Sequence, residues 1–245
     1  MPETPAPHSH PARTIDEMIA KKGFVVAHRG GSKSWPESSL KAFTNAAALG
    51  ADALEFSTSP TKDGVWVGSH DSTLMRVDPS APDIRIVDMT YAEVQKYRTH
   101  GEPIIRIEEL VEAVGLSHVF VIDPKDGTDR VTDLLKVIES IGLTRENTIL
   151  KSEAKQLPMA HTVHEAGWKC WAFVYEKEID ELPQWADAWD FLGMQWDASP
   201  ETWDRINAYG KPVWGHICEN REQYDEAMRK GAAGCMTAGV ADVLG

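Results

Sequence analysis

The chain has 245 residues, of which 42% are hydrophobic and 26% are charged, and its formal net charge is −13. That length is enough for one large domain or two small ones with a full hydrophobic core. The acidic balance argues against duplex nucleic acid as a partner, because binding to its phosphate backbone requires a basic face. It also disfavours long-range attraction of an anionic substrate, so any phosphate site has to be made positive locally.

The N-terminal residues 1–13 are rich in proline and lack the apolar segment of a signal peptide. We therefore expect them to form a disordered tail. No stretch approaches the roughly 18 apolar residues that a membrane-spanning helix needs. Three cysteines without paired spacing predict neither a disulfide framework nor a zinc site. These features favour a cytoplasmic location, and they leave a virion or another non-classical location open.

From Thr14 onward, short apolar runs alternate with longer amphipathic segments. The runs predicted to be strands are, in chain order, Phe24–His28, Ala53–Thr58, Val65–His70, Val119–Asp123, Thr148–Lys151, Cys170–Tyr175, Phe191–Met194, Pro212–His216 and Gly234–Thr237. The segments predicted to be helices are Ser39–Leu49, Tyr91–Arg98, Ile107–Val114, Asp129–Ile141, Leu157–Glu165, Glu201–Ala208 and Arg221–Lys230.

This alternation predicts βαβ units and a parallel sheet. A closed (β/α)8 TIM-type barrel needs eight strands, one fewer than the candidates, and Phe191–Met194 is the weakest of them. An open doubly wound sheet is the competing fold, but the pair Gly30–Gly31 lacks the spacing of a dinucleotide-binding loop. No linker or composition break divides the chain, so residues 14–245 are predicted to form a single barrel domain.

Polar residues gather where several predicted strands end, which is where barrel enzymes carry their active sites. In chain order they are His28, Arg29, Glu55, His70, Asp71, Asp123 and Lys125. Two imidazoles suit general acid–base chemistry near neutral pH. Carboxylates on neighbouring strands suit a hard cation, and basic side chains suit a phosphoryl group. Each residue alone fits a structural role, but structure alone gives no reason to place all of them on one rim.

The segment HRGGSKSWPESSLKAFTNAAALGADALEFSTSPTKDGVWVGSHDSTLMR resembles the signature of the glycerophosphodiester phosphodiesterases. That family has His-Arg-Gly, a Pro-Glu turn, a Glu-x-Asp strand, a Thr-Lys-Asp-Gly turn and a His-Asp pair. The resemblance continues more faintly through IVDMTYAEVQKYR and EPIIRIEELVEAV to PVWGHICE and GAAGCMT. It therefore covers residues 24–237, and its first fifty residues are highly specific.

The resemblance implies that His28 and His70 are the general acid and base. Arg29 and Lys125 would hold the non-bridging oxygens of the phosphate, and Trp214 would form an apolar wall for the alcohol moiety. The reaction implied is metal-assisted hydrolysis of a glycerophosphodiester to an alcohol and a glycerol phosphate. The partner would be a small-molecule or lipid-derived phosphodiester.

The resemblance further implies a divalent cation, Mg²⁺ or Ca²⁺, held by Glu55 and Asp123 and polarising the phosphate as a Lewis acid. Asp123 stands where the family usually has glutamate, so its shorter arm requires a closer approach or a bridging water. Glu37 matches the family's turn glutamate and is expected to brace the loop that carries His28.

The strand-two motif departs from the family, because Ser57 stands where the second carboxylate is usual. A neutral hydroxyl is a poorer ligand for a hard cation, so the metal is expected to bind weakly unless another acid compensates. Glu153 is a candidate replacement, although an exposed rim position explains it as well. Near the C-terminus, Ala238 stands where an aspartate is usual.

These departures leave two alternatives beside the hydrolase. One is a lyase or transferase of the sphingomyelinase D type, in which a substrate hydroxyl attacks to give a cyclic phosphate. The other is a catalytically impaired barrel that binds a glycerophosphate or a polymer containing it. The tryptophans that could form such a binding surface are Trp168, Trp171, Trp185, Trp189, Trp196 and Trp203.

Overall fold

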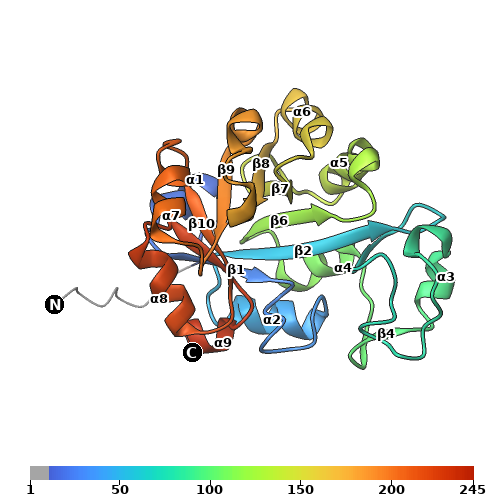
Figure 1. Cartoon of the computed structure of the whole chain (residues 1–245). Coiled ribbons are helices and arrows are strands. Elements are labelled where there is room, and N and C mark those ends of the chain that lie inside the picture. Colours follow the sequence, from blue (N-terminus) through green and yellow to red (C-terminus); the bar gives the residue numbers. More distant parts are fainter. Residues whose placement is uncertain (1–10) are drawn as a thin grey trace.

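The computed structural model describes residues 11–245, and within them eight parallel strands close into a barrel. Closure comes from β1, which pairs with β2 on one side and with β11 on the other. Figure 1 shows the strands at the centre with helices around them. The barrel strands, in order around it, are β1 (Phe24–His28), β2 (Ala53–Pro60), β6 (Val119–Pro124), β7 (Thr148–Glu153), β8 (Lys169–Val174), β9 (Phe191–Gln195), β10 (Val213–Cys218) and β11 (Gly234–Thr237). The predicted single-domain (β/α)8 barrel is confirmed.

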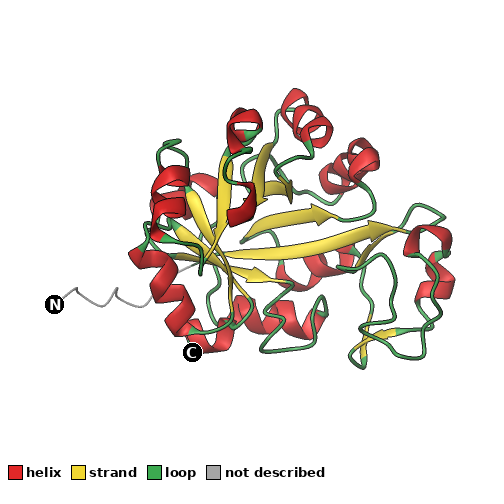
Figure 2. Cartoon of the chain, viewed as in Figure 1, coloured by secondary structure: helices red, strands yellow, loops and turns green. Residues whose placement is uncertain are grey.

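The helices cover the outside of the barrel, as Figure 2 shows in red around the yellow strands. They are α1 (Ile15–Ala20), α2 (Leu40–Ala48), α4 (Ile107–Val114), α5 (Val131–Ser140), α6 (Leu157–Glu165), α7 (Pro200–Asn207), α8 (Arg221–Arg229) and α9 (Val240–Leu244). In α4 the buried residues Ile107, Leu110 and Val111 follow the spacing of one helical face. Between β8 and β9 the connection consists of three short 3₁₀ turns, η3 (Glu176–Glu178), η4 (Leu182–Gln184) and η5 (Ala186–Ala188).

The surplus strand candidate is Val65–His70, and the expectation that Phe191–Met194 was the weakest strand is wrong. Phe191–Met194 forms most of β9 and pairs in parallel with both β8 and β10. Val65–His70 instead contains β3 (Trp66–Gly68), which runs antiparallel to β2 outside the closed barrel. The reason is the length of the connection, because a parallel crossover needs a dozen or more residues and only a short turn separates β2 from β3.

Residues 69–106, which we call the insert, separate β3 from α4. They contain η1 (Ile86–Asp88), α3 (Tyr91–Val94), and the two-stranded pair β4 (Arg98–Thr99) and β5 (Glu102–Pro103). The insert has a small apolar cluster of its own that includes Leu74, Ile86 and Val94. Figure 1 shows α3 and β4 in a lobe beside the barrel. His70 therefore reaches the site from the start of the insert rather than from the end of a barrel strand.

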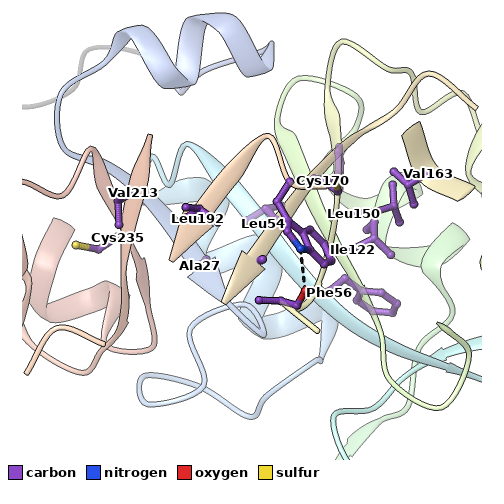
Figure 3. Close-up of a cluster of buried hydrophobic side chains, with 14 of the residues drawn as sticks. Ala27, Leu54, Phe56, Ile122, Leu150, Val163, Cys170, Leu192, Val213 and Cys235 are labelled. Atoms are coloured by element: carbon purple, nitrogen blue, oxygen red, sulfur yellow. Dashed lines mark hydrogen bonds between the residues drawn. The ribbon is translucent and has the colours of Figure 1, made fainter. Parts of the chain in front are cut away.

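Alternate residues of the barrel strands face opposite sides, which produces two apolar clusters. The outer cluster lies between the strands and the helices, and Figure 3 shows Ala27, Leu54, Ile122 and Leu150 within it. The inner cluster fills the barrel beneath the site, and Met18 of α1 belongs to it and closes its lower end. Burying one such Leu or Ile side chain contributes about 1.5–3 kcal/mol, so both clusters hold the site's strands in place.

The N-terminal tail predicted for residues 1–13 lies largely outside the described residues. Of the remainder, Ala12 is buried, and its backbone N–H donates to the Asp52 carboxylate at 3.2 Å. The packed part of the chain therefore begins by Ala12, before Thr14. In the described residues, 11–245, none of the helices has the length and apolar character that crossing a membrane requires.

Candidate active site

The inward-facing positions of the barrel change from apolar to polar at the carboxyl ends of the strands. His28 of β1 is level with Glu55 of β2, and Ser57 of β2 is level with Asp123 of β6. Lys151 of β7 occupies the next inward position around the barrel, two residues beyond the apolar Ile149. All five polar residues are buried, with at most 4% of the residue exposed. Strand alternation therefore gathers these groups into one layer.

The centre of this layer is an ion-paired cluster built around Lys151. Its Nζ lies 2.9 Å from Oε1 of Glu55 and 2.8 Å from Oδ2 of Asp123. Nζ of Lys125 also lies 2.6 Å from Oδ2 of Asp123. The Ser57 hydroxyl donates to Oε1 of Glu55 at 2.9 Å. Two carboxylates and two ammonium groups thus neutralise one another inside the barrel.

The cluster keeps its members charged although they are buried. Burial by itself would raise the pKa of Glu55, but the adjacent Lys151 ammonium holds that pKa at about 2. The pKa of Asp123 is likewise lowered, because Lys151 and Lys125 outweigh the effect of burial. Burial would lower the pKa of Lys151, but the two carboxylates raise it above its ordinary value. All three groups are therefore ionised near neutral pH.

The two predicted catalytic imidazoles line the same pocket above this cluster. Burial, followed by the positive charge of Lys151, lowers the pKa of His28 well below its ordinary value. Its Nδ1 is buried without a hydrogen-bond partner among the described residues. Burial and the positive charge of Lys125 also lower the pKa of His70, while its contact with Asp71 acts in the opposite direction. Both rings are consequently neutral in the free protein near neutral pH.

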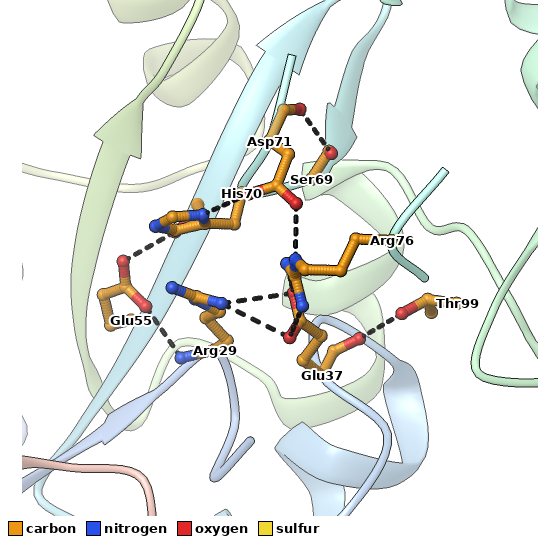
Figure 4. A network of polar contacts seen from close by, with 9 residues as sticks. Arg29, Glu37, Glu55, Ser69, His70, Asp71, Arg76 and Thr99 are labelled. Carbon is orange, nitrogen blue, oxygen red and sulfur yellow. Dashed lines mark hydrogen bonds and ion pairs between the residues drawn. The ribbon is translucent and has the colours of Figure 1, made fainter. Parts of the chain in front are cut away.

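A chain of charged contacts joins the β1–α2 loop to the insert, as Figure 4 shows. Nδ1 of His70 lies 2.7 Å from Oδ1 of Asp71, whose other carboxylate oxygen accepts from Nε of Arg76. Arg76 also donates through its two terminal nitrogens to both oxygens of Glu37, at 2.8 and 2.7 Å. Glu37 further accepts from Arg29 at 3.3 Å. Glu37 thus contacts protein side chains on both sides, which is a bracing position.

Arg29 contributes to the site through its backbone as well as its side chain. Its φ of 52° is in the left-handed region, and its N–H donates to Oε2 of Glu55 at 2.7 Å. The bend turns the chain sharply after His28 and fixes the orientation of Glu55. Arg76, which completes this network, was not among the sequence candidates, because its distance from the strand ends gave no signal.

One wall of the pocket is aromatic, but Trp214 does not form it, so that expectation is wrong. Trp214 is completely buried one layer lower, where it stacks on Trp171 with 5.2 Å between ring centroids. The prediction placed Trp214 on the correct face of its strand, because Trp214 does face the barrel interior. The sequence reasoning did not assign the residues of this wall to the pocket. They are Trp171 and Phe173 of β8, Tyr175 directly after β8, and His216 of β10.

His216 follows Trp214 by two residues, so the same alternation would have identified it. Burial lowers the pKa of its imidazole to about 4, and its Nε2 lies 3.3 Å from the carbonyl oxygen of Val174. The rings of Trp171, Phe173 and Tyr175 all have centroids about 6 Å from that of His216. His216 is therefore a neutral part of the aromatic wall.

The proposed replacement ligand, Glu153, does not join the cluster. Its carboxylate pairs with Lys155 at 3.0 Å, and 44% of its side chain is exposed on the rim. Lys151 on the same strand was overlooked as a site residue. A lysine inside a strand that is otherwise buried is itself a signal, because such a charge needs partners.

Comparisons with known proteins identify the family of this chain. A model of the glycerophosphoryl diester phosphodiesterase family matches residues 28–237, from the first imidazole to the end of the last barrel strand. The chain belongs to this family. A glycerophosphodiester phosphodiesterase of Caldanaerobacter subterraneus is 36% identical over 102 residues, which is 38% of this chain and 41% of that protein. Mouse glycerophosphodiester phosphodiesterase 1 is 38% identical over 141 residues, covering 52% of this chain and 42% of its own length.

Solved structures of the family share the fold. A protein from Agrobacterium tumefaciens, described as a glycerophosphoryl diester phosphodiesterase, has a TM-score of 0.77 and 22% identity. The match covers 90% of this chain and 95% of that one. An Oleispira antarctica phosphodiesterase, solved with the product sn-glycerol-3-phosphate, also has a TM-score of 0.77, with 17% identity and coverage of 91% and 95%. At such identities the likeness establishes the barrel and its topology.

The family resemblance implies a divalent cation, and the residues of this chain do not fit that expectation. The two carboxylates that would hold the ion are bound to the Lys151 ammonium, and the third ligand position carries the neutral Ser57. Three potential ligands do gather among residues 11–245, namely His164, Cys170 and Asp190. They lie where β8 begins, at the opposite end of the barrel, and burial raises the pKa of the Cys170 thiol to about 12. Such a thiol stays protonated and is a poor ligand.

Proposed function

We propose that this chain hydrolyses a glycerophosphodiester to an alcohol and a glycerol phosphate. The observation that carries the proposal is the meeting of His28 and His70 in one pocket that Lys125 and Lys151 also line. Neutral imidazoles can exchange protons near neutral pH, and the ammonium groups attract the anionic phosphodiester. The relatives named above and the product seen in the Oleispira protein support the same substrate class.

In the proposed reaction a water oxygen attacks phosphorus while the bond from phosphorus to the alcohol oxygen breaks. His28 takes the proton of the water, because its pKa is lowered well below the ordinary value and its ring is neutral. His70 supplies the proton that goes to the leaving alkoxide. Its ring is neutral in the free protein, and it takes up this proton when the anionic phosphodiester binds, because that negative charge adds to the effect of Asp71, which already favours the protonated form. The products are one alcohol and one phosphomonoester, so atoms and charge balance without any further reactant.

In this proposal Lys125, like Lys151, places an ammonium group beside the phosphate. It lies on the rim of the pocket with Nζ 5.8 Å from the centroid of Phe173, and 19% of its side chain is exposed. Charge on the phosphoryl oxygens grows in the transition state, so a fixed ammonium stabilises that state more than the bound diester. Arg29 is paired with Glu37, and in this proposal its guanidinium would assist Lys125 in holding the phosphate.

Turnover of a glycerophosphodiester panel at neutral pH tests the proposal. We expect release of glycerol phosphate and free alcohol, followed by phosphorus NMR and by a coupled assay for the alcohol. A cyclic phosphate product would indicate the lyase or transferase chemistry instead. Binding of the diester without any turnover, in a folded sample, would identify a binding module and overturn the hydrolase.

Replacing Asp71 with asparagine is expected to move the limb of the pH–rate profile that His70 governs to lower pH. Burial already lowers the pKa of His70, and Asp71 is the group that opposes this shift, so its loss lowers that pKa further. The direction is the same whether His70 acts as acid or base. Measuring kcat against pH tests this, with Asp83→Asn, an exposed aspartate of the insert, as the control. An unmoved profile would exclude Asp71 as the positioning residue of His70.

A further inference from the structure

A lysine ammonium from the protein lies between the carboxylates that β2 and β6 contribute to the site. The Lys151 ammonium lies within 2.9 Å of one oxygen of Glu55 and within 2.8 Å of one oxygen of Asp123. Only 5% of the Lys151 side chain is exposed, compared with 0% for Glu55 and 2% for Asp123. This is a buried bridge between two strands rather than a rim contact.

Both carboxylate oxygens of Glu55 accept hydrogen bonds from protein groups. Oε2 accepts the backbone N–H of Arg29, and Oε1 accepts the Ser57 hydroxyl in addition to Lys151. An ion entering here would have to remove the ammonium and also meet the hydroxyl of Ser57 where a second carboxylate would be needed. Compared with a site of three carboxylates and no lysine, this site has one negative charge fewer and one positive charge more. Both differences weaken the binding of a divalent cation.

Two aromatic rings of β8 lie close to the Lys151 ammonium. The Lys151 nitrogen lies 5.8 Å from the Trp171 ring centroid and 5.7 Å from the Phe173 ring centroid. Aromatic faces attract a cation, so these contacts add to the two ion pairs. Lys151 donates a hydrogen bond to Glu55 and forms an ion pair with Asp123. Because Lys151 also lines the pocket, one of its three N–H donors remains available to a ligand.

We propose that the Lys151 ammonium takes the place of the divalent cation in this chain, so that the site functions without a bound metal ion. This inference rests on the proposed function and concerns how the same site stabilises the phosphoryl group. The ammonium orients Glu55 and Asp123 and directs its third donor to a non-bridging oxygen. It supplies a single fixed charge, so activation of the water is left entirely to the imidazoles.

The direct test is calorimetric titration of the wild-type protein with Ca²⁺ and with Mg²⁺, next to turnover assays with and without excess chelator. We expect no stoichiometric binding heat and a kcat that chelator leaves unchanged. Lys151→Gln, which keeps the length but removes the charge, is expected to lower kcat by about 10²–10³-fold. Lys155→Gln, which removes an exposed charge four residues away, is the matched control and is expected to keep full activity.

A variant designed to bind a divalent cation tests the same inference from the opposite direction. The double variant Ser57→Asp with Lys151→Gln restores a third carboxylate and removes the ammonium, so it is expected to bind one Ca²⁺ per chain. If this variant does not fold, the wild-type titration still decides the question. One ion bound per wild-type chain, lost in Glu55→Gln, with turnover abolished by chelator, would overturn the inference.

The failure of the proposed function would look different. Absence of turnover with every diester, with and without added metal, would remove the hydrolase and the catalytic role of Lys151 with it. The titration would then still report whether the two carboxylates accept an ion or keep the ammonium.

Discussion

Replacing either His28 or His70 with alanine is expected to lower kcat by about 10²–10⁴-fold, the range for loss of a general acid or base. His28 is buried at the end of β1, and His70 lies at the start of the insert, yet both line one pocket. Each is assigned one of two proton transfers in the same displacement, so neither can replace the other. The double variant is expected to lose little more than either single variant, because groups that act as a unit are not additive.

The measurement is kcat for a glycerophosphodiester in each variant, with circular dichroism to establish that the fold is retained. His161→Ala is a suitable control, because this exposed histidine belongs to α6 on the outside of the barrel. If either His28→Ala or His70→Ala kept near-wild-type activity at neutral pH, the assignment of the acid and base would be wrong. A higher KM with an unchanged kcat would instead mean that the imidazole binds the substrate and does not transfer a proton.

Much of the fold could be predicted from local pattern, because each βα unit has its own sequence signals. The segments predicted for α4 and α6 agree with the structure at both ends. The predictions for β9 and β3 failed for opposite reasons. β9 is short and contains Gly193, which gives a weak strand signal, although the backbone there has to pass close to Trp171. β3 has a strong strand signal, but its direction depends on the length of the preceding turn rather than on its own residues.

The site was predictable to the extent that it lies on single strands with strict alternation. His28, Glu55, Ser57 and Asp123 converge as the strand ends implied. The role of Lys151 was missed because it depends on two carboxylates that are 28 and 96 residues away in sequence, and only the closed barrel brings them together. Trp214 shows the complementary error, since alternation gives the face of a strand but not the depth of a residue along the barrel axis.

Replacing Lys151 with methionine is expected to lower the free energy of unfolding by about 3–5 kcal/mol, the range for removal of one partner from a buried ion pair. Methionine approximates the volume of the lysine stem, so the loss reports charge rather than a cavity. Lys125 would still neutralise Asp123, which leaves the Glu55 carboxylate at 0% exposure with only a hydroxyl and an amide as donors.

Denaturant unfolding of the wild type, Lys151→Met and the double variant Glu55→Gln with Lys151→Met measures this effect. The double variant is expected to recover part of the loss, because a neutral amide removes the charge that the single variant leaves buried without its partner. Lys155→Met, which breaks an exposed pair, is expected to leave stability unchanged. If Lys151→Met lowered the free energy of unfolding by less than about 1 kcal/mol, Glu55 would have another counter-charge or a water molecule beside it. A buried carboxylate without such a partner destabilises the folded state by more than that. Added Ca²⁺ tests whether Glu55 is left without a counter-charge, because an ion that binds there raises the free energy of unfolding of Lys151→Met by RT ln(1 + [Ca²⁺]/Kd).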